Sequence, residues 1–422
     1  MTPEQRKTAL ASALASIAAL TALVSQLQID DDPPKGPAWV SGDLHVHTTG
    51  CAPESTPIGM VKMMDAADIE IGAALLWGLA SEADQARFTG RDDPASTADH
   101  KLHYDLEVSQ YKAAQFGHLV GLGLSKIDFS PSPKTYPGSG IPIARWARDQ
   151  GEGVLLGMAH IQMWPYNNTY PELVNGKPGF RPYELPILVG LGLADFMAVE
   201  SSPEYPVSLG PMALWSAFLN SGFRVSLIGS TDYPCISPEQ GRPKAVGSWR
   251  TLALVDGDRS YQAFLDAVRA GKTQVSLAGN LPLEFTVDGV PIGGEIRILS
   301  GQKVDVRVSG LFDGPAQVLL NGSLATTLTV QSGQPSVFRT WGFSKSAWLS
   351  VRTKTVQTGA IYVIVDGLPI RSQKDSCYLA GYVDHLSWLV SSGAFGESAK
   401  ESLGEYARAK FEFLQRSSGS CN

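Results

Sequence analysis

Cysteine and positive charge are both scarce in this sequence, and each scarcity excludes a class of protein. The four cysteines include no CxxC pair, which excludes a cysteine-rich zinc ribbon. Lysine and arginine number 34 against 41 acidic residues, so the formal net charge is −7, and the basic residues form no cluster. Nucleic acid backbones and anionic lipids require such a cluster. We therefore expect a small-molecule substrate, and neither nucleic acid nor a membrane as the primary partner.

Apolar residues, in contrast, are plentiful. Hydrophobic residues make up 43% of the 422 residues and charged residues 18%, which indicates a folded protein with a large core. The chain is too long for one small core and suits two or three domains.

The N-terminal segment 1–36 has two interpretations. Arg6 and Lys7 precede an Ala/Leu-rich stretch at 8–24, which is typical of a secretory signal and would place the protein in the periplasm or outside the cell. The apolar residues also recur at spacings of three and four, which predicts an amphipathic helix that docks or forms a homo-oligomer, and a cytoplasmic protein. The Pro-rich segment 29–37 predicts a linker, and no other stretch approaches a membrane span.

Short apolar runs alternate with helical stretches between Trp39 and Gly279, which predicts an α/β fold with a parallel sheet. Seven strands without a Gly-rich dinucleotide fingerprint favour a barrel over a Rossmann sheet. The expected strands are 40–47, 69–78, 118–124, 153–160, 196–202, 224–232 and 249–256. The expected helices are 58–68, 141–150, 211–222 and 261–271.

Polar residues lie where four of these predicted strands end. These residues are His47, His160, Glu200 and Asp232. The carboxyl ends of barrel strands meet at one mouth, so the joint pattern indicates a metal cup. Taken singly, a histidine here is more often hydrogen-bonded or solvated, and an aspartate often caps the next helix.

The sharpest local pattern is the segment from Asp43 to His47. Residues two apart in a strand share a face, so His45 and His47 can direct both imidazoles at one ion. Leu44 and Val46 then point into the barrel wall. Asp43 falls on the histidine face, where it either orients His45 or forms a loop hydrogen bond.

The segment GDLHVHT at 42–48 resembles the first motif of the PHP (polymerase and histidinol phosphatase) superfamily, and the rest of the chain resembles its CehA/McbA branch, named for carbaryl hydrolases. The supporting segments are 104–110, 117–124, 153–160, 229–234, 249–276 and 405–415. The resemblance covers nearly everything after residue 38. It implies a distorted (β/α)7 PHP-type barrel at 37–279, to which a β domain and a helical tail are attached.

After Gly279 the sequence alternates apolar and polar residues between Gly-rich turns, which predicts an antiparallel β domain at 280–372. By itself this domain could be a carbohydrate-binding module, whereas the resemblance implies an accessory β-sandwich packed on the barrel. The tail at 373–422 is expected to carry a flanking helix near 398–416 that returns to brace the β-sandwich.

The resemblance also implies two metal sites that share one carboxylate. The first would take His45, His47, Glu107 and Asp232, and the second would take Glu107, His118 and His160. Zinc, manganese and iron all accept such imidazole and carboxylate ligands.

The ligands of the family's third metal site are missing. The chain has Leu75, Leu76 and Trp77 where the family has Thr-Asp-His, and Asp232-Tyr233-Pro234 where the family has Asp-x-His. A further histidine of the family falls near Pro53. We therefore expect a binuclear centre.

The cysteines suggest a replacement for the third site. Cys51 follows the first motif and Cys235 follows Pro234, so our hypothesis is a Cys51–Cys235 disulfide, with Cys377–Cys421 clasping the tail. Free buried thiols are the rival interpretation. If the disulfides form, an exported location gains weight.

Two divalent ions bridged by a carboxylate can lower the pKa of a shared water from roughly 15.7 towards about 7, so the expected nucleophile is a metal-bridging hydroxide. The expected catalytic residues are Glu107, His160 and Asp232, with Asp232 or a nearby histidine moving the proton. A hydrolase is the first expectation, and a non-catalytic metal-dependent binding protein is an alternative.

The expected substrate pocket is aromatic. Its predicted lining residues are Trp77, Trp164, Tyr166 and Tyr233. Such a lining suits an aryl or hydrophobic ester, carbamate or amide, although each aromatic residue could equally pack under a loop. Lys126 and Arg250 are the only nearby basic residues, and they keep a phosphoesterase as the alternative.

Three histidines have no expected metal role. His100 and His103 lie at the end of an insertion that begins near Ser81. Their spacing of three could place both on one helix face as ligands, but the resemblance assigns them no metal, and we predict solvated loop histidines. His385 lies in the tail and is interpreted as structural.

Overall fold

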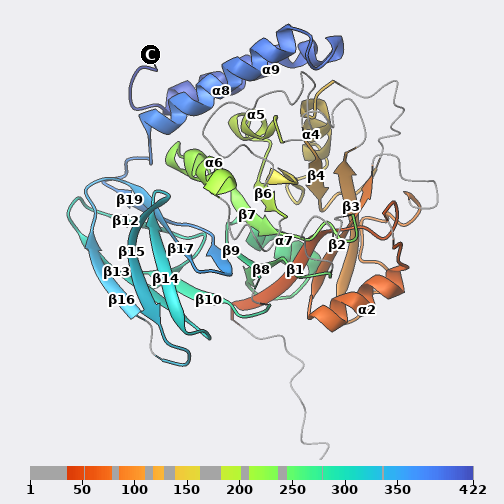
Figure 1. Cartoon of the computed structure of the whole chain (residues 1–422), viewed down its shortest axis with the longest axis horizontal. Helices are drawn as coiled ribbons and strands as arrows, with labels where there is room; N and C mark the ends of the chain where they lie inside the picture. The colour runs from red at the N-terminus through yellow and green to blue at the C-terminus, as the bar shows by residue number, and fades with distance from the viewer. Residues whose placement is uncertain are drawn as a thin grey trace, which may run out of the picture.

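The computed structural model describes residues 36–51, 53–77, 85–109, 117–127, 138–161, 182–200, 209–235, 245–277, 279–334 and 337–421. These residues form a central curled sheet with helices, a β-rich body beside it, and a helical pair that covers the opposite end (Figure 1). The expected N-terminal helix lies outside the described residues. Among the helices that the structure describes, none has the length and apolar character to cross a membrane.

The central sheet is mixed. Its strand order is β9-β8-β1-β2-β3-β4-β5-β6-β7. The strands are β1 (Ala38–Val46), β2 (Ile71–Trp77), β3 (Lys101–Val108), β4 (Leu119–Leu122), β5 (Leu155–Met158), β6 (Phe196–Val199), β7 (Ser226–Gly229), β8 (Arg250–Val255) and β9 (Thr273–Ser276). The parallel pairs are β1–β2, β2–β3, β5–β6 and β6–β7.

The expected series of seven parallel strands is therefore wrong in part. Strand β4 is antiparallel to both β3 and β5, and β8 is antiparallel to both β1 and β9. The connection at 109–118 between β3 and β4 is shorter than the dozen or more residues that a parallel crossover needs, so β4 returns beside β3 as a hairpin.

The sequence did not predict β9 or β3. For β3 the reason is burial. Its residues from Leu102 to Val108 are all buried, so both faces are covered and the strand is not half-exposed. One face carries His103, Asp105 and Glu107, which are polar residues in the interior of the fold. Buried polar positions hide the apolar pattern on which strand prediction depends.

The two ends of the central sheet contact each other through side-chain hydroxyls. Thr273 of β9 donates a hydrogen bond to the carbonyl oxygen of Leu227 in β7 at 2.7 Å. The backbone N–H of Gly229 donates to Oγ1 of Thr251 in β8 at 3.0 Å. The curl of the sheet brings the ends of its strands together at one mouth.

Helices α2 (Pro57–Ala67), α4 (Ile141–Arg148), α6 (Leu209–Asn220) and α7 (Tyr261–Arg269) match the four expected helices. Thr56 caps α2, because its Oγ1 accepts a hydrogen bond from the Gly59 N–H at 3.0 Å. Helix α5 (Leu185–Gly190) was not expected; all its residues are buried, so it has no amphipathic pattern.

The β-rich body contains strands β10 to β19. They are β10 (Leu283–Val287), β11 (Val290–Pro291), β12 (Glu295–Ile298), β13 (Lys303–Gly310), β14 (Gly314–Leu320), β15 (Ser323–Val330), β16 (Val337–Gly342), β17 (Ala347–Arg352), β18 (Val356–Thr358) and β19 (Ile361–Val365). One sheet has the order β11-β10-β13-β16, and the other continues the central sheet because β18 pairs with β9. The body is antiparallel except that β12 pairs in parallel with β19.

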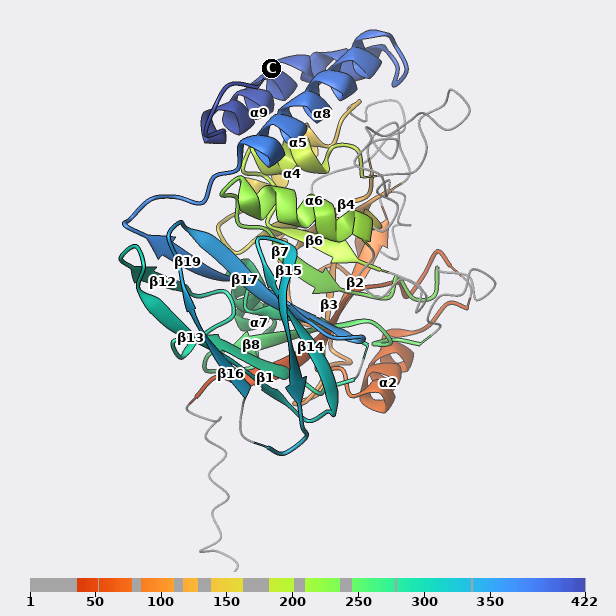
Figure 2. The ribbon, with the colours of Figure 1, turned by 60° about the vertical axis from the view of Figure 1, so that its left-hand side comes forward.

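The C-terminal tail packs on the helices of the central body. It consists of α8 (Gln373–Ser391), a 3₁₀ helix (Glu397–Ser402) and α9 (Leu403–Arg416), and it lies over α5 in both views (Figure 2). Tyr406 donates a hydrogen bond to Oε1 of Glu184 at 2.7 Å, and Tyr382 donates to the Tyr183 carbonyl oxygen at 2.8 Å. The helix predicted near 398–416 corresponds to α9, which packs against α5 and α8 and not across the β-sandwich as predicted. The tail is held by buried tyrosines that bind groups next to α5. The sequence of the tail does not indicate which part of the chain these tyrosines contact.

Candidate metal centre

Six of the sequence-predicted residues meet at the mouth of the central sheet. His45 and His47 lie at and just after the end of β1, Glu107 lies near the end of β3, and His118 directly precedes β4. His160 and Asp232 follow β5 and β7. Their donor atoms form two groups, within each of which all atoms lie within 4.8 Å of one another: His45, His47 and Asp232, and Glu107, His118 and His160.

The first group is built around two imidazole nitrogens. Nε2 of His45 lies 3.1 Å from Nε2 of His47. Oδ1 of Asp232 lies 3.4 Å from the first of these nitrogens and 3.1 Å from the second. All three side chains are at most 10% exposed, so water is largely excluded from this group.

Glu107 joins the two groups. Its Oε2 lies 3.3 Å from Nε2 of both His45 and His47. Its Oε1 contacts Nδ1 of His118 and lies 3.8 Å from Nε2 of His160, and those two nitrogens are 3.1 Å apart. One carboxylate therefore offers a separate oxygen to each group of donors, which is the geometry of a bridging ligand.

Two of the six residues have backbone angles that are uncommon for side chains with a Cβ. His160 has φ 57° and Asp232 has φ 54°, both in the left-handed region. The backbone N–H of Asp232 donates to the His45 carbonyl oxygen at 2.8 Å, which holds this turn against β1. Such conformations occur at functional sites when the surrounding structure stabilises them.

Glu200, at the end of β6, contacts one histidine of each group. Its Oε1 lies 2.5 Å from Nδ1 of His45, and its Oε2 lies 2.6 Å from Nδ1 of His160. Ser230 donates a hydrogen bond to Oε1 at 3.0 Å, and Glu200 is fully buried. A carboxylate at Nδ1 favours the proton there and leaves the Nε2 lone pair facing the donor group.

Glu200 was predicted from the sequence to lie at the cup, without a predicted contact. Its position at a strand end was the available signal. What the sequence did not indicate is that two histidines from different strands share this carboxylate.

Two roles were predicted for Asp43, orienting His45 or forming a loop hydrogen bond. The structure shows the loop hydrogen bonds. Asp43 accepts hydrogen bonds from Thr231 Oγ1 at 2.6 Å, from the Gly247 N–H at 2.9 Å and from the Thr231 N–H at 3.1 Å. Its contact with His45 is to the backbone N–H, at 3.4 Å. Burial raises the pKa of Asp43 to about 6 against the opposing effect of these hydrogen bonds. Asp43 therefore positions the turn that carries Asp232.

The electrostatics of the centre suit a cation. Burial disfavours a charged His45, but the carboxylates of Glu200, Glu107 and Asp232 outweigh it and raise the pKa of His45 well above its ordinary value. The same balance raises the pKa of His160 to about 10. Burial likewise opposes the charged form of Glu107, yet the neighbouring histidines hold its pKa well below its usual range. Divalent cations can replace such protons, and the nitrogen and oxygen donors fit zinc, manganese or iron.

The predicted pocket aromatics are only partly within the described residues. Trp164 and Tyr166 lie outside them, and so does the side chain of Trp77, whose backbone pairs with Glu107. Tyr233 is half-buried against the apolar cluster under α2, and its carbonyl oxygen accepts a hydrogen bond from the His47 N–H at 2.7 Å.

The contacts of Arg250 and Lys126, the two basic residues considered for a phosphate substrate, are with the fold around them. Arg250 donates to the Gly247 carbonyl oxygen at 2.8 Å and to Asn280 Oδ1 at 2.6 Å, so it is a structural residue. The backbone N–H of Lys126 donates to Oε1 of Gln150 at 3.1 Å in a surface turn.

The remaining histidines lie outside the two donor groups. His103 stacks on Tyr261 with ring centroids 4.2 Å apart, and His100 Nδ1 lies 2.8 Å from the Ile69 carbonyl oxygen. Both contacts pack these residues against the fold, so the prediction of solvated loop histidines is wrong. His385 lies in α8 near Trp388.

A disulfide lies directly beside the centre. Cys51 and Cys235 are joined with an S–S distance of 2.00 Å, which is the pairing that the sequence analysis hypothesised. The Cys235 N–H donates to the carbonyl oxygen of Asp232 at 2.8 Å. The disulfide therefore ties the loop after β1 to the turn that presents Asp232. A second disulfide joins Cys377 to Cys421.

No protein-family model matches the sequence, and a search of curated protein sequences found no match. Among solved structures, the chain is similar to a two-domain protein from Bacteroides vulgatus ATCC 8482 that contains a predicted PHP-like metal-dependent phosphoesterase. The TM-score is 0.39 and the sequence identity 14%, over 81% of this chain and 96% of that chain. A similarity at this level decides neither the fold nor the activity of the present chain.

Proposed function

We propose that this chain is a PHP-type hydrolase of the CehA/McbA kind that uses two divalent metal ions. The observation that carries the proposal is Glu107, whose two oxygens face two separate groups of donors. The curled central sheet then serves as the distorted barrel of that family, with domain boundaries near residues 37, 280 and 373.

The donor set fits such ions. His45, His47 and Asp232 would hold one cation and His118 and His160 the other, with Glu107 between them. When bound, the ions would polarise a substrate oxygen and make a coordinated water acidic near neutral pH. Zinc, manganese and iron are all compatible with these ligands.

The chain's own residues supply orientation and proton transfer. Glu200 holds the rings of His45 and His160, so their Nε2 atoms stay directed at the centre. Asp232 is the most exposed carboxylate of the centre, and its Oδ2 lies 3.9 Å from Nε2 of His160. We assign to Asp232 Oδ2 the role of accepting a proton during hydrolysis and returning it to the leaving group.

For the substrate, we propose a small aryl or hydrophobic ester, carbamate or amide, held by the aromatic residues Trp77, Trp164, Tyr166 and Tyr233. A phosphomonoester or phosphodiester is the alternative, because both carbonyl and phosphoryl oxygens can be polarised by metal ions. The two disulfides support an exported location for the enzyme.

The test is a hydrolysis panel on the full chain, loaded with zinc, manganese or iron. The panel contains an aryl acetate, an aryl carbamate, an anilide, an aryl phosphate and a bis-aryl phosphodiester. We expect turnover of a carbonyl substrate that disappears with a chelator and in Glu107→Ala, but not in the control His385→Ala. Turnover of the phosphate compounds alone would support the alternative substrate class. Metal binding without turnover of any compound would support a non-catalytic binding protein instead.

A further inference from the structure

A cavity of about 280 Å³ lies where the central body, the β-rich body and the tail meet. Its walls come from the end of α6 and the turn that follows, from β12 and β19, from the linker to α8 and from the last residue of α9. None of its lining residues belongs to the metal centre. Its volume is near the lower end of the range for small-molecule sites.

The cavity is strongly basic in a chain whose net charge is negative. Four arginines line it, Arg224, Arg297, Arg371 and Arg416, with Glu295 as the lone acidic residue among the lining residues. Both oxygens of Glu295 are already engaged, because Arg224 binds Oε2 and Arg297 lies 2.6 Å from Oε1. The charges of Arg371 and Arg416 therefore have no acidic side chain of the cavity to neutralise them.

The guanidinium of Arg416 is held against an aromatic ring, but part of it has no hydrogen-bond acceptor among the described residues. Its Cζ lies 4.1 Å above the ring of Phe223, a ring that packs edge-on against Phe413. The nearest carboxylate oxygen, of Glu412, is 3.8 Å from Nη2, beyond hydrogen-bond distance. Its Nε–H is buried and makes no hydrogen bond within the part of the chain that the structure describes. Over the described residues, no carboxylate lies within hydrogen-bond distance of its Nη atoms either, so these groups can bind an anion from the cavity.

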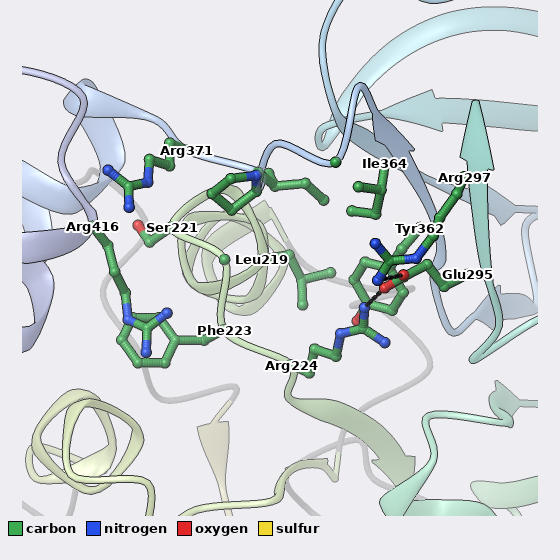
Figure 3. Close-up of a pocket in the computed structure, with 14 residues that line it drawn as sticks. Leu219, Ser221, Phe223, Arg224, Glu295, Arg297, Tyr362, Ile364, Arg371 and Arg416 are labelled. Atoms are coloured by element: carbon green, nitrogen blue, oxygen red, sulfur yellow. Dashed lines mark hydrogen bonds and ion pairs between the residues drawn. The ribbon is translucent and has the colours of Figure 1, made fainter. Parts of the chain in front are cut away.

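Arg371 lies on the same side of the cavity as Arg416. Over the described residues, no carboxylate forms an ion pair with Arg371, and its side chain is exposed. Figure 3 shows Arg371 and Arg416 on one side of the cavity, the Arg224–Glu295–Arg297 cluster on the other, and apolar side chains of Leu219 and Ile364 between them.

We propose that this cavity binds a small organic carboxylate with a compact apolar body. The carboxylate would accept hydrogen bonds from Arg371 and Arg416, since guanidinium groups match its planar geometry. The apolar body would lie against Leu219 and Ile364, which an inorganic anion would leave in contact with water. The site is separate from the proposed hydrolase and does not depend on it.

The test is calorimetric titration of the full chain with benzoate. We expect saturable binding, and at least tenfold weaker binding in Arg371→Gln and in Arg416→Gln, a loss of about 1.4 kcal/mol or more. Arg371 is exposed, so its variant is expected to fold even if Arg416→Gln does not. Arg339→Gln, an exposed arginine of β16, is the matched control and should bind benzoate as the wild type does. Neutral benzamide should not bind.

Several results would overturn the proposal. One is no binding of benzoate at about 20 mM, a concentration that would nearly saturate a millimolar site. A second is unchanged affinity in both arginine variants together with a loss in His47→Ala, which would place benzoate at the metal centre. A third is inorganic phosphate or benzamide binding as tightly as benzoate, which would remove the requirement for an organic anion.

Discussion

Oε2 of Glu200 lies 2.6 Å from Nδ1 of His160 and 2.9 Å from the backbone nitrogen of the same residue. The carboxylate thus contacts both the ring and the backbone of a residue whose φ is left-handed. Its other oxygen contacts Nδ1 of His45 in the other donor group. A single buried side chain therefore orients one histidine of each proposed metal site.

This relationship predicts that Glu200→Gln weakens both metal sites together. The glutamine amide keeps the shape of the glutamate side chain but removes its negative charge. Its NH2 group also faces one of the two Nδ1–H groups, so that two donors meet there and no hydrogen bond forms. We expect roughly 10- to 100-fold weaker binding of both metal equivalents by chelator competition. Ser230→Ala, which removes a hydrogen bond to the same carboxylate, should have a much smaller effect. Loss of only one equivalent in Glu200→Gln would show that Glu200 serves one site.

Metal affinity should rise with pH. Despite burial, the carboxylates raise the pKa of His45 and raise that of His160 to about 10, so the metal-free protein retains these protons at neutral pH. A bound cation must displace them, because only the unprotonated nitrogen is a ligand. We expect tighter binding at pH 8 than at pH 6, and proton release when metal is added in weak buffer. Binding that is independent of pH over this range would contradict the protonation states described above.

Removal of the Cys51–Cys235 disulfide should affect both stability and metal binding. The double variant Cys51→Ser/Cys235→Ser frees the loop next to Asp232, so we expect a loss of roughly 2–5 kcal/mol in the free energy of unfolding and weaker metal affinity. The control Cys377→Ser/Cys421→Ser lies in the tail and should change stability alone. Peptide mapping without reductant checks the pairing itself. Recovery of Cys51 and Cys235 as free thiols would refute it.

The attachment of the tail should depend on pH through Glu184. This residue is fully buried and accepts hydrogen bonds at 2.7 Å from Tyr406 and from the Gly140 N–H. Burial raises its pKa above 4.5 against the opposing effect of these hydrogen bonds. Above pH 4.5 the unfolded chain therefore loses a proton that the folded chain retains, so the stability contributed by Glu184 falls as the pH rises towards the folded-state pKa.

Glu184→Gln has no such titration. We expect its free energy of unfolding, relative to the wild type, to increase between pH 4.5 and pH 7.5 in urea denaturation. Tyr406→Phe keeps the carboxyl group and should lose about 1 kcal/mol, with the larger loss at pH 7.5, because this hydrogen bond favours the charged carboxylate. A difference between Glu184→Gln and the wild type that does not change with pH would contradict this account.

The meeting of the six donor residues was predictable from sequence for a physical reason. Period-two spacing puts His45 and His47 on one face, and strand ends at one mouth bring His160 and Asp232 to them. Glu107 depended on the family resemblance, because β3 is buried on both faces and shows no strand pattern. His118 depended on it too, because this residue precedes its strand and does not end it. The contact of Glu200 with both His45 and His160 joins residues far apart in the chain, so the sequence pattern did not reveal it.

The errors in the fold have similar causes. The direction of β4 depends on the length of one connection, which hydrophobic runs do not reveal. The docking of the tail on α5 depends on Ala409 meeting Gly190, where a Cβ built on the glycine would lie 3.0 Å from the alanine Cβ. Close approach of two small residues leaves little trace in a single sequence.

The central claim is that Glu107 bridges two metal ions. Metal content per chain, measured on purified wild type, Glu107→Ala and the control His385→Ala after saturation and removal of free metal, tests it most directly. We predict about two equivalents for the wild type and the control, and a loss affecting both equivalents in Glu107→Ala. One equivalent in the wild type, or two equivalents that persist in Glu107→Ala, would contradict the account.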